Sequence, residues 1–324
     1  MKALVYEGPY ELSYRDMPDP EPGPGEVLVK IHAVGLCGSD MHAYHGADER
    51  RPPPLILGHE AAGVVHDTGR RVTINPLLPN YDSENSRAGW TNICPDRRIM
   101  SMPPRQGSFA EWAVVPERSL ITVPDHVSFE KASLAEPIAC GWHAINLSEE
   151  RMRHKLAESE AVVIGGGAIG VGAALSLCAK GAGKITILET NPTRIPVLES
   201  LGAIEVIHPD NYDASPHLVI DAYGGERSRA LACAIVQPGG FIAHIGLASA
   251  EGGIDARRLT LWEIGFIGTY TYTEDAFRQT AEAIFDGRLG TLDWPETTAL
   301  ADAADAFRAH DEGRMATPKT IFIP

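Results

Sequence analysis

The chain is short of cysteine, of long apolar runs and of positive charge, and each shortage excludes a class of protein. Its five cysteines are an odd number at wide spacings, which argues against a disulfide framework and favours a reducing setting. No apolar run approaches the ~20 residues that span a bilayer. With 28 Lys and Arg against 43 Asp and Glu, the formal charge of −15 argues against nucleic acid or an anionic membrane surface as a partner. The opening residues, MKALVYEGPYELSYRD, lack a basic region followed by an apolar core, so we expect no secretory signal and a cytoplasmic protein.

The remaining composition, 44% apolar and 22% charged over 324 residues, is that of a globular protein long enough for two domains. Residues 1–137 contain short apolar or alternating runs between Pro and Gly clusters, the pattern of a compact barrel or sandwich. From residue 138 helices and strands alternate, as in a doubly wound parallel sheet. The last apolar run, Lys319–Ile323, has no obvious place in that sheet. We therefore predict an α/β protein with a Rossmann domain at 138–274 and a discontinuous β-rich domain at 1–137 and 275–324.

The stretch AVVIGGGAIGVGAALSLCAKGAGKITILETNPTR, residues 161–194, has the order of a dinucleotide-binding unit. A short apolar run leads into Gly165-x-Gly167-x-x-Gly170 and a helical stretch, and Glu189 stands at the end of the next apolar run. Gly165 allows a tight turn, Gly167 lets the backbone approach a diphosphate, and Gly170 lets the helix lie close to the sheet. A glycine turn before a helix is common by itself, but here the strand, the helix and the acid coincide.

The start of this predicted helix favours phosphate charge through its free N–H groups and its dipole. A carboxylate at Glu189 can accept hydrogen bonds from both ribose hydroxyls of an adenosine and would repel a 2′-phosphate, so we predict NAD over NADP. Residues after the last two strands are expected near the nicotinamide, although an ordinary core strand and turn explains them equally well. The predicted cofactor-binding residues are Gly165, Gly167, Ala168, Ile169, Gly170, Glu189, Arg194, Ile245 and Thr269.

Three polar stretches interrupt the apolar pattern of the first domain: CGSDMH, GHEAAG, and Ala-Glu-Pro at the domain junction. Together they offer one thiolate, one imidazole and two carboxylates. Zinc accepts this donor set, and a catalytic zinc uses three protein ligands with an open fourth position. Taken singly, the cysteine fits a small buried residue, the histidine a hydrogen-bonded structural residue and the acids surface charges. The candidate metal ligands are Cys37, His59, Glu60 and Glu136.

The motifs CGSDxH, GHEAAG and AEPIACGWHA, followed by GGGAIG and an acid at the second strand tip, resemble the zinc-dependent medium-chain dehydrogenase/reductase superfamily, in particular its polyol dehydrogenases. The resemblance covers nearly the whole chain. It implies a GroES-like catalytic domain and a Rossmann NAD domain with the active site between them, one catalytic zinc per chain, and a homodimer or homotetramer. Cys37 and His59 would bind zinc with Glu60 or Glu136 as third ligand, and Asp40 would orient His59.

The resemblance also implies the chemistry, a hydride transfer between a secondary alcohol and NAD. Ser39 and His42 would relay the alcohol proton to solvent, and zinc would lower the pKa of the alcohol. Glu60 is a third catalytic candidate, because the acid that does not bind the metal holds a zinc-bound water in some members. Without the resemblance, Ser39 fits a serine that caps a helix, and His42 fits a solvated surface histidine.

The sequence departs from the family pattern at two places. Most members hold a structural zinc with four closely spaced cysteines, but residues 75–95 retain only Cys94, so we predict no structural zinc and a reshaped or disordered lobe. Sorbitol dehydrogenases place an arginine after the last Rossmann strand, where this chain has Thr271. A polyol, a cyclitol, a sugar acid and a sugar phosphate therefore all stay open as the small-molecule substrate.

Three other functions remain alternatives. One is the oxidation of an amino alcohol, as in the related L-threonine dehydrogenases. A second is a non-catalytic NAD-binding protein that has lost its zinc, and a third is a zinc-free quinone reductase. The presence of Cys37, His59 and Glu60 together argues against the last two.

Overall fold

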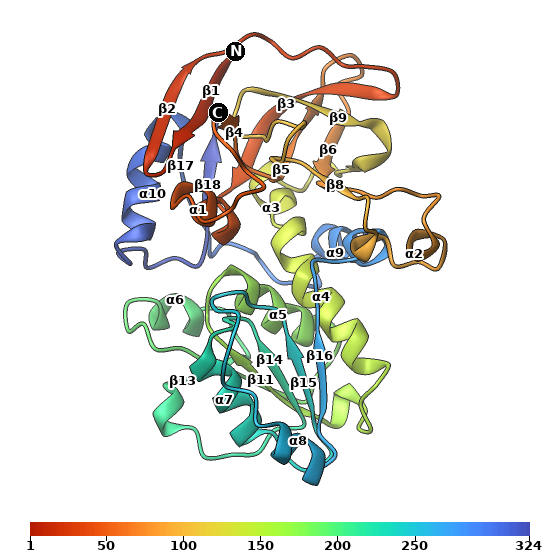
Figure 1. Cartoon of the computed structure of the whole chain (residues 1–324), viewed down its shortest axis with the longest axis vertical. Helices are drawn as coiled ribbons and strands as arrows, with labels where there is room; N and C mark the ends of the chain where they lie inside the picture. The colour runs from red at the N-terminus through yellow and green to blue at the C-terminus, as the bar shows by residue number, and fades with distance from the viewer. The chain divides into compact units, whose positions relative to one another are not determined.

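The computed structural model describes residues 1–324, which form two compact units (Figure 1). The first unit comprises Met1–Glu136, Phe277–Asp286 and Pro295–Pro324, and the second comprises Pro137–Ala276 and Gly287–Trp294. The sequence-based ranges differ from these units mainly at residues 287–294, which pack with the second unit. None of the helices has the length and apolar character that a membrane crossing requires.

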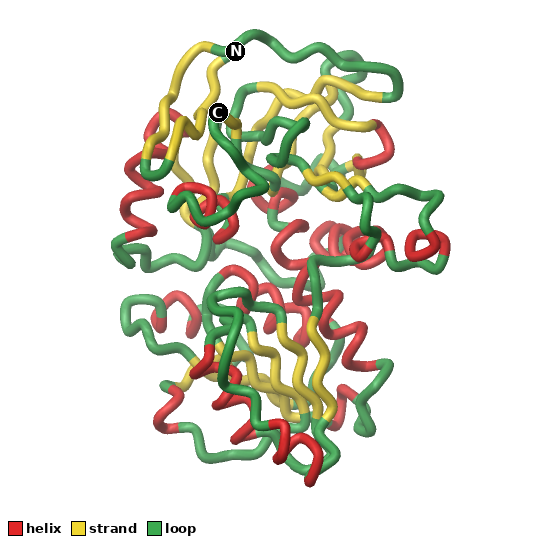
Figure 2. Tube along the Cα trace, viewed as in Figure 1, coloured by secondary structure: helices red, strands yellow, loops and turns green.

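The regular structure of the first unit consists mainly of strands, drawn yellow in Figure 2, which long loops connect. Its strands are β1 (Lys2–Gly8), β2 (Glu11–Asp16), β3 (Glu26–Gly35), β4 (Leu55–Ile56), β5 (Glu60–Val65), β6 (Arg71–Ile74), β7 (Leu77–Leu78), β8 (Arg98–Ile99), β9 (Trp112–Pro116), β10 (Leu120–Thr122), β17 (Glu296–Ala299) and β18 (Thr320–Ile323). Its helices are α1 (Gly38–Tyr44), α2 (Glu84–Arg87), α3 (Phe129–Ser133), most of α9 (Glu274–Phe285) and α10 (Ala303–Asp311), with 3-10 turns η1 (Thr91–Ile93), η2 (Glu117–Ser119) and η5 (Leu300–Asp302).

The main sheet of the first unit has the order β10-β6-β5-β3-β18-β17, and β9 also pairs with β3. A second sheet has the order β2-β1-β4. The rings of Phe109, Phe307 and Phe322 are fully buried and contact one another, so they anchor the core between the early and late parts of the chain. Antiparallel pairing of β18 with β3 places the last strand of the chain beside an early one, as Figure 1 shows.

The second unit is a single parallel sheet with helices on both faces. Its strands are β11 (Glu160–Ile164), β12 (Lys184–Leu188), β13 (Glu205–Ile207), β14 (Leu218–Asp221), β15 (Phe241–His244) and β16 (Gly265–Gly268). Its helices are most of α4 (Ala135–Glu149), α5 (Ala168–Ala179), α6 (Ile195–Glu199), α7 (Glu226–Ile235) and α8 (Ala256–Leu261), with 3-10 turns η3 (Leu156–Glu158) and η4 (Pro209–Asn211). The strand order is β13-β12-β11-β14-β15-β16, with every pairing parallel.

Burial on both faces explains why the strands of this sheet are almost entirely apolar. Val162 and Ile164 pack in one core with Ala232 and Cys233 of α7. Val163 points to the other face, where it lies against the first turn of α5. The predicted fold class, a Rossmann sheet with a discontinuous β-rich domain, is confirmed. Helix α8 was not predicted, because its six residues are too few to show a helical period.

Candidate active site

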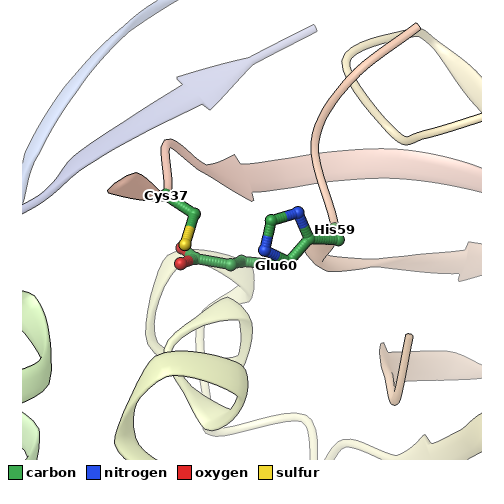
Figure 3. Close-up of side chains that lie close together, drawn as sticks. All are labelled: Cys37, His59 and Glu60. Carbon is green, nitrogen blue, oxygen red and sulfur yellow. The ribbon is translucent and has the colours of Figure 1, made fainter. Parts of the chain in front are cut away.

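The pairing of β3 with β5 brings the first three candidate ligands together. Gly35, the last residue of β3, is the register partner of Glu60, the first residue of β5, so Cys37 and His59 lie just beyond the paired ends. The ligand atoms of Cys37, His59 and Glu60 all lie within 4.8 Å of one another. Figure 3 shows a ring nitrogen of His59 facing the sulfur of Cys37 with the Glu60 carboxylate beside it. A thiol, an imidazole and a carboxylate at this spacing fit a zinc ion.

Asp40 ties the two ligand-bearing loops to each other. Its Oδ2 accepts a hydrogen bond from the backbone N–H of Cys37 at 3.0 Å, which caps the start of α1. Its Oδ1 accepts one from the N–H of Gly58 at 3.2 Å and lies 3.5 Å from Nδ1 of His59. The single carboxylate therefore orients the imidazole, as the resemblance implied, and also positions the cysteine.

The charges of this buried group reinforce each other. Burial disfavours a charged imidazole, but Asp40 and then Cys37 act more strongly and raise the pKa of His59 well above its ordinary value. Burial also opposes ionisation of Asp40, yet His59 and Arg51 keep the pKa of this carboxyl below its usual range. Asp40 is therefore ionised at neutral pH, which makes it an effective acceptor for the Nδ1 proton of His59.

Glu60 forms a buried ion pair that the sequence did not reveal. The Nζ of Lys319 donates to both carboxylate oxygens of Glu60 at 2.7 Å and to the carbonyl of Leu36 at 2.8 Å. Lys319 reaches this position because it immediately precedes β18, which pairs with β3. Burial lowers the pKa of Lys319, but Glu60 and then Cys37 outweigh it, so the net shift is upward. The carboxylate of Glu60 is thus held in place by a charged neighbour.

The other acidic candidate, Glu136, is buried at the start of α4 but is not part of the three-residue group. Its charge contributes to the raised pKa of Lys319, although less than Glu60 and Cys37 do. Lys319 therefore interacts electrostatically with both acids that were predicted as alternatives for the third ligand.

Glu60 leaves no room for a side chain at position 35, and this gives a first testable prediction. A Cβ added at Gly35 would lie 2.0 Å from Oε2 of Glu60, and the other side of this carboxylate is held by Lys319. We expect Gly35→Ala to destabilise the protein by about 1–3 kcal/mol, because the overpacked carboxylate must move. Thermal unfolding measures the change. The matched control is Gly38→Ala, where an added Cβ meets nothing within 4 Å. Equal stability of the two variants would contradict this account of Gly35.

The two predicted relay residues lie on α1, three positions apart. The hydroxyl of Ser39 lies 3.5 Å from Nε2 of His59, on the side of the ring that faces the group of ligands. His42 is exposed in the last turn of the helix. Residues at this spacing share one side of a helix, which suits a path from the half-buried hydroxyl of Ser39 to solvent.

The lobe that retains one cysteine is ordered. It contains β7, α2, η1 and β8, and Ser83 caps α2. Cys94 is fully buried, accepts a hydrogen bond from the N–H of Asn80 at 3.4 Å and lies among polar groups. Burial raises the pKa of its thiol, but hydrogen bonds from Ser83, Asn80 and Ser86 lower this pKa by more, so the net shift is downward. Oxygen and nitrogen groups thus surround Cys94, so the lobe is held by hydrogen bonds around a single thiol.

In the second unit, the predicted glycine turn has the shape that a dinucleotide needs. Gly165 has φ +98°, a left-handed conformation that favours glycine, and a Cβ on Gly170 would lie 1.8 Å from the carbonyl oxygen of Gly165. Gly167 caps α5, and a Cβ there would meet nothing within 4 Å, so its backbone is open to a ligand. Ala168 and Ile169 form the first turn of α5, and the free N–H groups at the start of a helix favour an anionic group.

Glu189 lies at the end of β12 with its carboxylate facing this turn. Its Oε2 accepts from the N–H of Gly166 at 2.9 Å and lies 3.2 Å from Nη1 of Arg194. Its Oε1 accepts from the N–H groups of Thr190 and Asn191 at 2.7 Å. The carboxylate is therefore fixed beside the glycine turn, with a guanidinium as its only charged partner in these contacts.

The remaining two predicted cofactor residues follow the neighbouring strands β15 and β16. The N–H of Ile245 donates to the carbonyl of Asp221 at 2.9 Å. Thr269 uses both its N–H and its hydroxyl to contact the carbonyl of His244, at 2.9 and 3.3 Å. In a parallel sheet the carboxyl ends of the strands line the ligand-binding edge, which is where both residues lie.

Replacing Glu189 gives a second prediction. In Glu189→Ala, Arg194 loses its carboxylate partner and is free to pair with a 2′-phosphate. We expect the preference for NAD over NADP to fall on the order of tenfold to a hundredfold, since both repulsion and competition for Arg194 are removed. Dissociation constants of the two cofactors, measured by fluorescence, test this. Glu199→Ala, which replaces an exposed residue of helix α6 in the same unit, is the control. An unchanged ratio in Glu189→Ala would contradict the role of Glu189.

Comparison with known proteins agrees with this geometry. The family model described as alcohol dehydrogenase GroES-like domain matches residues 23–125, and the model described as zinc-binding dehydrogenase matches residues 168–286. A sorbitol dehydrogenase of Bacillus subtilis is 30% identical over 273 residues, covering 77% of this chain and 76% of that protein. The sorbitol dehydrogenase of Ovis aries is 29% identical over 294 residues, covering 83% and 82%. The structure of galactitol-1-phosphate dehydrogenase from Escherichia coli superposes with a TM-score of 0.89 at 22% identity, covering 100% of both chains.

The fold and the group of thiol, imidazole and carboxylate define an oxidoreductase of the zinc-binding dehydrogenase class. The chain belongs to the zinc-dependent medium-chain dehydrogenase/reductase family, as its motifs predicted. It is thus a small-molecule enzyme.

Proposed function

We propose that this protein is a zinc-dependent oxidoreductase that transfers a hydride between NAD and a secondary alcohol, namely a polyol, a cyclitol or a sugar derivative. The observation that carries the proposal is the convergence of Cys37, His59 and Glu60 within 4.8 Å, in a chain that also has an ordered dinucleotide turn. The names of the similar proteins, sorbitol dehydrogenase and galactitol-1-phosphate dehydrogenase, favour a substrate with several hydroxyls.

In this proposal Cys37, His59 and an acid would hold zinc. A zinc ion bound there would act as a Lewis acid and lower the pKa of the alcohol. Bound NAD supplies the hydride acceptor. Asp40 fixes the orientation of His59 and the capped start of α1. Ser39 accepts the alcohol proton, and His42 passes the proton to solvent. Glu189 binds the adenosine ribose, and the start of α5 binds the diphosphate.

For the third ligand we propose Glu60 over Glu136. Glu60 lies inside the group of ligand atoms, whereas Glu136 does not. Lys319 neutralises the charge of Glu60 and keeps its carboxylate close to the thiol. Zinc content after dialysis distinguishes the acids, because a catalytic zinc depends on all three of its protein ligands. We expect Glu60→Gln to lose most of its zinc and Glu136→Gln to retain it. The reverse result would assign the third ligand to Glu136.

Thr271 bears on the choice of alcohol, because it stands where sorbitol dehydrogenases have an arginine. It has φ +44°, which is strained for a β-branched residue, and its buried hydroxyl makes no hydrogen bond. A hydroxyl cannot replace the five donors of a guanidinium. We therefore propose a polyol-like substrate other than sorbitol.

The experiment that tests the proposed function is an assay of NADH formation with a panel of alcohols. The panel contains linear polyols, cyclitols, sugar acids, sugar phosphates and L-threonine, each with NAD and with NADP. We expect turnover of at least one polyol-like alcohol with NAD. Turnover of L-threonine alone would support the amino-alcohol alternative, and inactivity of a zinc-loaded protein on all of them would contradict the proposal.

We also propose a cellular location and an oligomeric state. The five cysteines form no disulfide, which suits the reducing cytoplasm that we propose. A homodimer or homotetramer is proposed from the family, and light scattering measures it.

A further inference from the structure

The first unit buries a single arginine, Arg51, whose guanidinium contacts three separate segments of the chain. Arg51 is 2% exposed. Its Nη1 donates to the carbonyl of Ser39 at 2.9 Å and to Oδ2 of Asp48 at 3.0 Å. Its Nε donates to the carbonyl of Ser101 at 3.1 Å. Burying a guanidinium is costly unless it is paired and hydrogen-bonded, so these contacts hold it in one orientation.

The two serines that Arg51 joins lie on either side of His59. The hydroxyl of Ser39 is 3.5 Å from Nε2 of His59, and the hydroxyl of Ser101 is 3.5 Å from Nδ1. Ser101 is fully buried and has φ +62°, a left-handed conformation that is uncommon for a serine. The hydrogen bond from Arg51 to its carbonyl stabilises this conformation. Arg51 therefore contacts both serines beside the imidazole, Ser39 through its carbonyl and hydroxyl and Ser101 through its carbonyl.

We infer that Arg51 is a positioning residue that orients the hydroxyl of Ser39 for proton transfer, an inference that rests on the proposed function. The Nη2 of Arg51 lies 3.4 Å from Oγ of Ser39. A guanidinium has donors and no acceptor, so Ser39 can only accept from it. The O–H of Ser39 must then point away from Arg51.

The charge of Arg51 also suits the relay. When a proton moves from the alcohol to Oγ of Ser39, the original hydroxyl proton leaves for the next acceptor, so the number of protons on Ser39 is unchanged. A fixed cation beside Oγ stabilises the negative charge that develops there if the hydroxyl proton leaves first. Asp48 balances the cation: burial raises the pKa of its carboxyl, but Arg50 and Arg51 lower it more.

Arg50 is a matched control for Arg51. It is adjacent in the chain and also pairs with Asp48, through Nε at 2.8 Å and Nη2 at 3.0 Å. Its side chain is 61% exposed and bonds neither serine in these contacts. Replacing Arg50 therefore removes a positive charge from the same carboxylate while Arg51 keeps its contacts with Ser39.

The test compares Arg51→Met, Arg51→Lys, Arg50→Met, Ser39→Ala and the double variant Arg51→Met/Ser39→Ala. For each, kcat and KM for the best alcohol of the panel, zinc content and the NAD dissociation constant are measured. We expect Arg51→Met to lower kcat on the order of tenfold to a hundredfold, with zinc content and NAD binding unchanged. Arg51→Lys is expected to have a higher kcat than Arg51→Met, because a lysine keeps the positive charge but lacks the planar set of guanidinium donors. Arg50→Met stays within about twofold of the wild type.

The double variant decides whether Arg51 acts through Ser39. If it does, adding Arg51→Met to Ser39→Ala lowers kcat by less than about twofold, and the solvent deuterium isotope effect on kcat rises in the single variant Arg51→Met. Three results would each overturn the inference. The first is a double variant in which the kcat losses of the two single variants multiply, the second is a wild-type kcat in Arg51→Met, and the third is loss of zinc from Arg51→Met. If Arg51→Met does not fold, the same cycle with Arg51→Lys decides by the same criteria. A zinc-loaded wild type inactive on every alcohol overturns the proposed function and this inference together, whereas the multiplied losses overturn the inference alone.

Discussion

Replacing Cys37 with serine is expected to reduce alcohol turnover on the order of a thousandfold or more while NAD binding stays unchanged. A serine hydroxyl does not ionise at neutral pH, so the variant lacks the thiolate that the proposed zinc site requires. All residues assigned to the dinucleotide lie in the second unit, whereas Cys37 lies in the first. Zinc content is expected to fall with activity, and the NAD dissociation constant to stay within about twofold of the wild type.

The control for this variant is Cys178→Ser, which replaces an exposed cysteine on α5. It is expected to keep full activity and full zinc content. The assay follows NADH formation with the best alcohol of the panel, and atomic emission gives the zinc content. Comparable turnover in Cys37→Ser and the wild type would contradict the proposed zinc chemistry.

The second large effect is expected at Lys319. In Lys319→Met, Glu60 keeps its buried carboxylate but loses its ion-pair partner. Both side chains of this pair are almost completely buried, at 2% and 1% exposure, so water cannot replace the lysine. Removing one member of such a pair typically destabilises a protein by about 3–5 kcal/mol, and we expect a loss of this size in the free energy of unfolding. Unfolding is measured by denaturant titration on chelator-treated protein, so that metal binding to Glu60 does not contribute.

The double variant Glu60→Gln/Lys319→Met separates the ion pair from the packing of the two side chains. A neutral amide opposite a thioether leaves no buried charge, and we expect most of the lost stability to return. Lys319→Met with wild-type stability, or a double variant less stable than Lys319→Met, would show that the pair does not hold Glu60 as described.

The dinucleotide half of the molecule was largely predictable because its signals are local. The glycines of the turn, the apolar strand before them and Glu189 all lie within one short stretch, and each has a distinct geometric reason. The short helix α8 was missed, since six residues carry no clear period. The family and the α/β fold class followed from motifs whose order and spacing are specific.

The catalytic half was predictable in its residues but not in its contacts. The resemblance implied that Cys37 and His59 converge, but the register of β3 and β5, which brings them together, is seen only in the structure. Lys319 is 259 residues from Glu60 in the sequence, and only the pairing of β18 with β3 brings them together. Arg51 belongs to the charged segment DERR, whose composition is typical of a solvated loop, and nothing local marks it as buried.

The most direct test of the account is to measure zinc and activity together in one preparation. The purified chain is predicted to contain about one zinc ion, to oxidise a polyol-like alcohol with NAD, to lose this activity on treatment with a chelator and to regain it when zinc is restored. Full activity that persists after the zinc has been removed would contradict the claim that Cys37, His59 and Glu60 form the catalytic metal site.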